Sequence, residues 1–232
     1  IIGGTAATAF HSLTINKAAG GVTLGRDTTV GGTLALTSGV VSTGSYTLIV
    51  SSGGSVSRAS CSAMSSSCFV AGNLRKSVAI GTSVALVHEI GTGSVYSPVS
   101  LTFASVSVAG TLTAAATAGA HADLANSDVD PTKYVARYWT ATAAGGLAFT
   151  SASATFSFAT GDIVGGGDPL EFIVGRLSGT WSMPTVGART STSTEATGLT
   201  AFGDFVLGIQ RIYPPVATDD AYSFYVGNTL LV

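Results

Sequence analysis

Residues 31–41, with the sequence GGTLALTSGVV, decide the fold that we expect. Alternation over residues 33–36 places Leu34 and Leu36 on one face of a β-strand, because successive side chains of a strand point to opposite sides. Glycines on both sides of this run end the strand early. A strand this short cannot build a sandwich by itself, but it buries its apolar face when it stacks as one coil of a β-solenoid.

The same pattern recurs on both sides of this stretch. Gly-Gly pairs at residues 20–21 and 53–54 separate further short runs. We therefore predict a β-solenoid-like segment of strand repeats over residues 1–69. The repeat period is irregular, so a set of tight meander hairpins remains the alternative. The short strands that we expect cover residues 13–15, 22–24, 29–30, 33–36, 40–41, 46–50 and 55–56.

Longer alternating runs, separated by turn residues, follow over residues 70–212. Longer strands at this spacing are typical of an immunoglobulin-like β-sandwich, which we predict here. Helical periodicity is nearly absent along the chain, so the fold class that we expect is all-β. The longer strands that we expect cover residues 77–79, 84–89, 99–108, 110–116, 134–142, 154–158, 170–177, 180–182 and 205–209.

The Pro-Pro pair after Tyr213 marks a boundary, because consecutive prolines favour a stiff extended linker. Residues 213–232 therefore form a linker and an unpaired C-terminal extension strand in our prediction. Tyr222, Phe224 and Val226 share one face of that strand. Such a strand needs a partner edge, so these three residues are candidates for a subunit interface.

Charge is scarce and evenly spread. Charged residues make up 9% of the chain, against roughly 25% in an ordinary soluble domain, and the net charge is −2. No basic stripe is present, which argues against nucleic-acid binding. The apolar runs are far shorter than the ~18 residues of a membrane span. A surface with so little charge is prone to association, which suggests covering by neighbouring copies.

Cys61 and Cys68 are spaced for a disulfide across a short serine-rich loop and lack a metal-binding pattern. An oxidised pair implies an exported protein, so we expect a secreted, extracellular or cell-surface location. No signal peptide opens the chain, and we expect a mature or trimmed N-terminus.

Catalytic patterns are not found. The histidines, His11, His88 and His121, lie far apart, and no Gly-x-Ser-x-Gly elbow is present. His88 and Glu89 are neighbours on an expected strand, so their side chains point to opposite faces and cannot act together. Most of the Asp residues lie in turns, where their side chains bond nearby backbone N–H groups. We therefore expect no enzyme activity.

Metal and glycan sites remain open. Asn126, Asp128 and Asp130 alternate like the first ligands of a calcium loop, but Pro131 and Arg137 stand where an EF-hand needs Gly and Glu. These three residues, together with Asp219 and Asp220, are the candidate calcium ligands; no other cofactor is expected. The aromatic residues that could stack on a glycan, core packing being the alternative, are Tyr134, Tyr138, Trp139, Phe149, Phe172 and Trp181.

Several motifs resemble a module of large secreted surface proteins from Bacteroidetes-like bacteria. The resemblance covers roughly residues 10–230, and it implies export, repeat architecture and a role in adhesion or surface assembly. The tail from Pro214 to Tyr222 resembles the opening of a cadherin-like or bacterial immunoglobulin-like repeat. In that tail, Asp219 and Asp220 resemble the inter-domain calcium ligands of cadherin-like repeats. The motifs are residues 73–76 (NLRK), 88–93 (HEIGTG), 118–121 (AGAH), 137–140 (RYWT), 172–175 (FIVG), 180–182 (TWS), 185–190 (TVGART) and 200–205 (TAFGDF), preceded by the repeat-like 32–39 (GTLALTSG).

We therefore expect a structural subunit of a surface assembly, a homopolymer whose copies join by β-strand addition. The strand could come from the C-terminal tail or from Ile1 and Ile2 at the N-terminus. The alternative is an adhesin or carbohydrate-binding module within a longer secreted protein.

Overall fold

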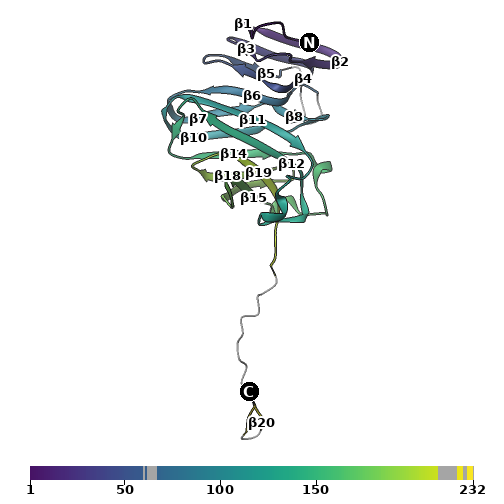
Figure 1. Ribbon diagram of the computed structural model, residues 1–232, viewed down its shortest axis with the longest axis vertical. Coiled ribbons are helices and arrows are strands. Elements are labelled where there is room, and N and C mark those ends of the chain that lie inside the picture. The colour runs from purple at the N-terminus through teal and green to yellow at the C-terminus, as the bar shows by residue number, and fades with distance from the viewer. Residues whose placement is uncertain (60, 62–66, 214–223, 227–228, 232) are drawn as a thin grey trace.

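The chain is all-β, as predicted. The computed structural model describes residues 1–59, 61, 67–213, 224–226 and 229–231. Its helices in these ranges are three short 3-10 turns, η1 (Leu124–Asn126), η2 (Thr160–Asp162) and η3 (Pro169–Glu171). Coils at the N-terminal end stack on a pair of sheets along the long axis (Figure 1). The first strands are β1 (Thr8–Phe10), β2 (Leu13–Thr23), β3 (Thr28–Val30), β4 (Thr33–Val50), β5 (Ser55–Ser57) and β6 (Val70–Val78).

The N-terminal strands form a β-solenoid. Thr8 of β1 pairs in parallel with Thr28, Thr28 with Leu48, and Leu48 with Leu74. Two further parallel rows run alongside, and one of them joins Leu13 to Leu34 and Leu34 to Val56. Parallel neighbours cannot be joined by tight hairpins, so this pairing excludes the meander alternative.

Strand β4 is much longer than expected, because it joins three of the predicted short strands. Its ladder continues around the corners of the coil at Gly39 and Gly44, which have φ angles of 91° and 58°. At Gly39 a Cβ atom would lie 2.8 Å from the carbonyl oxygen of Lys17 in the first coil. Glycine is needed at that corner for both the backbone angle and the close approach of the two coils.

Two sheets pack face to face over the rest of the chain. Trp139 and Phe205 of one sheet meet Phe156 of the other, with ring centroids 5.3 and 4.7 Å apart. One sheet continues from the solenoid in the order β6–β11–β12–β19–β15–β16, with β11 (Gly110–Ala118), β12 (Val129–Ala144), β19 (Asp204–Gln210), β15 (Ile173–Ser178) and β16 (Thr180–Ser182). The other contains β7 (Gly81–His88), β10 (Val99–Val108), β13 (Ala148–Phe149), β14 (Ala152–Ser157), β18 (Ser193–Leu199) and β17 (Thr185–Thr190). The short strands β8 (Ile90–Thr92) and β9 (Val95–Tyr96) complete the set.

Strand β6 belongs to both parts. It pairs in parallel with β4 and antiparallel with β11, so the solenoid and the sandwich share a continuous sheet. The buried apolar residues likewise form a cluster that runs from Ile15 in the first coil to Leu207 in β19. The predicted boundary near residue 69 therefore falls inside a continuous ladder and core.

The predicted C-terminal strand is present as β20 (Phe224–Val226), but it is not unpaired. It pairs antiparallel with β21 (Thr229–Leu231), in a two-stranded sheet separate from the other two. Only two residues separate these strands in the sequence, so the partner of β20 is a near neighbour along the chain. Tyr222, Asp219 and Asp220 lie outside the described residues.

Candidate functional site

The predicted disulfide between Cys61 and Cys68 is confirmed. Both cysteines are buried, and their sulfur atoms lie 3.1 and 3.3 Å from the carbonyl oxygen of Thr37 in the second coil. Arg58, just before the loop, donates from Nε to the Cys68 carbonyl at 2.5 Å and places its guanidinium 3.5 Å from the ring centre of Tyr96. The disulfide therefore cross-links two buried residues of the third coil, and it is compatible with an extracellular protein.

Two of the candidate calcium ligands, Asn126 and Asp130, make hydrogen bonds to neighbouring side chains. Asp130 accepts hydrogen bonds from the backbone N–H and the hydroxyl of Thr132, which lower the pKa of its carboxyl. Asn126 instead donates to Asp123. Within the described part of the chain, no group of three or more His, Cys, Asp or Glu side chains is placed to hold a metal ion.

The neighbouring aromatic residues Tyr138 and Trp139 of β12 face opposite sides of the sheet, as the alternation of side chains along a strand requires. Trp139 is fully buried between the sheets, and its Nε1 donates to the Ser97 carbonyl at 3.0 Å. Tyr138 points to the opposite, outer face of the sheet, where it is half-buried. Only Tyr138 is therefore accessible from the surface.

A second group of rings surrounds His121 on this outer face. The ring of His121 meets the rings of Tyr138 and Trp181 edge to face, with centroids 4.9 and 5.4 Å away. Its Nδ1 accepts from the Asp123 backbone N–H at 3.1 Å, so Nε2 carries the proton that is donated to Asp204 at 3.2 Å. This half-buried cluster of rings and carboxylates joins the loop after β11 to β12, β16 and β19.

Trp181 is held in this cluster from two sides. Its Nε1 donates to Asp123 at 2.8 Å, and this bond together with the one from Asn126 lowers the pKa of Asp123. Beneath Trp181, a Cβ atom on Gly175 would lie 2.9 Å from Val206 and 3.4 Å from the indole. The missing side chain of Gly175 therefore makes room for the ring.

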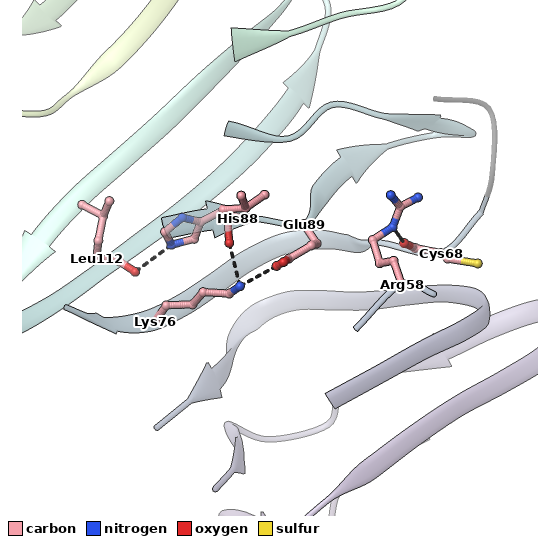
Figure 2. Close-up of polar contacts among 7 residues, drawn as sticks. Arg58, Cys68, Lys76, His88, Glu89 and Leu112 are labelled. Atoms are coloured by element: carbon pink, nitrogen blue, oxygen red, sulfur yellow. Dashed lines mark hydrogen bonds and ion pairs between the residues drawn. The ribbon is translucent and has the colours of Figure 1, made fainter. Parts of the chain in front are cut away.

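A cluster of buried ionisable groups lies where the solenoid meets the sandwich (Figure 2). Lys76 of β6 donates from Nζ to Glu89 at 2.6 Å and to the Val87 carbonyl at 2.6 Å. The relative exposure of the two charged side chains is 9% and 12%. Burial lowers the pKa of Lys76 and raises that of Glu89, and the attraction between the two opposes both shifts.

His88 points away from this ion pair. It is fully buried, and its Nε2 donates to the Leu112 carbonyl at 3.0 Å, while its Nδ1 has no hydrogen-bond partner among the residues that the structure describes (Figure 2). Burial lowers the pKa of His88 to about 3, so the ring is neutral. The expectation that His88 and Glu89 face opposite ways therefore holds in the structure. These three residues together tie the end of β7 to β6 and β11.

Sequence reasoning missed this polar cluster and the outer-face cluster. Lys76 and Glu89 belong to two separate motifs, residues 73–76 and 88–93, and nothing in either motif indicates that the two side chains meet. A lysine on a strand of alternating polar and apolar residues is normally expected to face solvent. Their pairing depends on how two sheets separate after β6, which local patterns do not encode.

Comparison with known proteins gives no match, either to a protein-family model or to a characterised sequence. The resemblance to surface-protein modules therefore rests on the quoted motifs alone. No helix in the described ranges is long and apolar enough to span a membrane.

His88 predicts an acid-sensitive fold. Because its pKa is about 3 in the folded state and its ordinary value is 6.5, the unfolded chain takes up a proton first as the pH falls. The stability that His88 contributes is complete above pH 6.5 and is lost between pH 6.5 and about 3, at about 1.4 kcal/mol per pH unit. Urea unfolding from pH 3.5 to 8 should show this slope, and His88→Gln should reduce it. His11→Gln, at an exposed position, is the control; equal slopes in all three proteins would contradict the assignment.

Lys76 and Glu89 predict a non-additive pair of substitutions. Lys76→Met leaves a buried carboxylate without its partner, which should lower the free energy of unfolding by about 3 kcal/mol. Adding Glu89→Leu removes the orphaned charge and should recover most of that loss. Urea unfolding at pH 7 measures both, with the exposed Lys133→Met as control. Additive losses in the double variant would show that the two side chains are not coupled.

Proposed function

We propose that this chain is a non-catalytic structural subunit of an extracellular or cell-surface assembly, whose copies join by β-strand addition. The observation that carries the proposal is the continuous sheet through β6, which joins the first coil to the far edge of the sandwich. A ladder of this kind makes a stiff, elongated body, because its hydrogen bonds run without interruption from one part to the next. Spacers and stalks of surface assemblies require such a body.

Three further features support this role. The disulfide suits an oxidising, extracellular environment. The low charge of the chain leaves its surface prone to association with other copies. The hairpin of β20 and β21 belongs to neither large sheet, so its outer edges are available to another strand within the described residues.

Deleting residues 214–232 tests the proposal. The buried cluster lies within residues 15–207, so the truncated chain should fold with unchanged far-ultraviolet circular dichroism. It should be monomeric, whereas the whole chain forms polymers that light scattering and electron microscopy detect. A tail of the same length with glycine and serine at residues 224–226 and 229–231 is the matched control, and it should also be monomeric. Polymers that persist in both variants would refute a role for the tail.

The second candidate is an adhesin or carbohydrate-binding module. It is favoured by the half-buried cluster of His121, Tyr138 and Trp181, which sets aromatic edges beside the carboxylates of Asp123 and Asp204. Aromatic surfaces next to hydrogen-bonding groups suit the apolar faces and hydroxyl groups of sugars.

A glycan array distinguishes the two candidates. For a carbohydrate-binding module, the wild-type chain binds a defined set of glycans, and Trp181→Ala reduces that binding at least about tenfold, the factor that loss of one stacking contact gives. Tyr213→Ala, at an exposed position after β19, is the control and should leave binding unchanged. Absence of glycan binding by the wild-type chain would remove this candidate.

A further inference from the structure

The first coil of the solenoid has an open edge. Strand β1 pairs with β3 and β2 pairs with β4, and neither has a strand on its other side within the described residues. In a parallel ladder, the backbone groups of alternate residues point to opposite neighbours. Thr8 donates its N–H to Asp27 at 3.2 Å and Phe10 accepts from the Gly31 N–H at 2.9 Å. The N–H and C=O of Ala9, between them, therefore point outward.

Thr14 is open in the same way. Ser55 in the third coil donates its N–H to the Gly32 carbonyl at 2.9 Å. This bond sets the alternation along β4, so that Leu34 faces the third coil and Ala35 faces the first. Ala35 then bonds to the residues on either side of its partner Thr14. The backbone groups of Thr14 consequently point away from the solenoid.

The edge already accepts one residue in parallel register. Ile2 donates its N–H to Thr23 at 2.9 Å and accepts from the Gly25 N–H at 2.7 Å, forming a parallel bridge with Leu24. This contact covers only one corner of the first coil. It shows that the outward edge has the geometry for strand addition, and it leaves Ala9 and Thr14 unoccupied.

Residues 8–15 of the open edge also lack two of the usual forms of protection. Exposed edge strands normally carry charged side chains or proline, which discourage pairing with another chain. Residues 8–15, with the sequence TAFHSLTI, contain no Asp, Glu, Lys, Arg or Pro. Terminal coils of solenoids usually need a polar cap for solubility. An unguarded terminal coil therefore favours occupation by a further strand.

The C-terminal hairpin supplies a fitting strand. A two-stranded sheet is marginally stable alone in water, so it gains stability by joining a larger sheet. The sequence of residues 221–232, AYSFYVGNTLLV, contains no charged side chain and so matches the uncharged edge. Strand β20 has the same three-residue length as β1.

We propose that the edge of the first coil at Ala9 and Thr14 is the acceptor, and that it binds strand β20 of a second copy. This inference rests on the proposed function and names the site and partner of the assembly. Because the acceptor and the donor are different surfaces of the chain, each added copy leaves one acceptor and one donor free. Contacts of this head-to-tail kind produce an open filament unless the rotation between copies closes a ring.

Two complementary variants test the assignment. Ala9→Pro with Thr14→Pro removes both outward N–H donors, and proline is tolerated on edge strands, so this variant lacks only the acceptor. Phe224→Asp with Val226→Asp places charges on the donor strand, so this variant lacks only the donor. Each variant alone should be monomeric by light scattering, whereas an equimolar mixture should form a one-to-one dimer and no longer polymer. Ala9→Ser with Thr14→Ser retains both N–H groups and should polymerise like the wild-type chain.

Each other outcome is decisive. A wild-type chain that stays monomeric at all concentrations overturns the proposed function itself. Wild-type polymers that also form in the proline variant overturn only the acceptor edge. Dimers of the donor-deficient variant alone would show that two open edges pair with each other, which overturns the tail as the occupant.

Hydrogen exchange provides a measurement that needs no substitution. In wild-type polymers, the amides of Ala9 and Thr14 should exchange more than about tenfold more slowly than in monomers of the donor-deficient variant. The exposed amide of Gly146, in the turn after β12, should not change. Equal exchange at Ala9 and Thr14 in both states would overturn the acceptor even if the proline variant failed to fold.

Discussion

The double pairing of strand β6 is the constraint on which the rest of this structure depends. One edge of β6 continues the parallel rows of the solenoid, where Leu74 follows Leu48, and the other begins the antiparallel sandwich, where Leu74 faces Ala114. A strand can serve both neighbours because its backbone groups alternate between its two edges. The conversion from parallel to antiparallel pairing therefore needs no separate linker, and the apolar core passes through it without a break.

This continuity explains where the buried polar cluster lies. After β6 the chain crosses to β7 in the other sheet. The single coil of the solenoid is therefore replaced at this point by two separate sheets with a space between them. Lys76 and Glu89 meet at 2.6 Å across that crossing, and His88 bonds to Leu112 beside it. Burying these groups is unfavourable unless each is paired. These groups contribute more to the specificity of the fold than to its net stability, because only one arrangement of β6, β7 and β11 satisfies most of their hydrogen bonds.

The sequence was informative where the structure depends on neighbours along the chain. Alternation at Leu34 and Leu36 predicted the solenoid, and the spacing of Cys61 and Cys68 predicted the disulfide; both are confirmed. The length of β4 was not predicted, because Gly39 reads as a strand end although parallel coils keep their ladder through the corner. The same glycine signal marks a turn in a hairpin and a corner in a solenoid, and only the neighbouring coil decides between them. The pairing of Lys76 with Glu89 and the ring cluster around His121 depend on contacts between distant strands, which local patterns do not encode.

The edges of the sandwich show what the first coil lacks. Strand β7 lies at one edge of its sheet, and Ser83 within it has a φ angle of 51°, which interrupts the pairing surface. Strand β17, at the opposite edge, has a register irregularity between Val186 and Arg189. Pro184 follows shortly after strand β16. Irregular and proline-flanked edges resist strand addition. Protection at these three edges, beside the regular and uncharged residues 8–15 of the first coil, directs any added strand to one end of the molecule and so favours growth along its long axis.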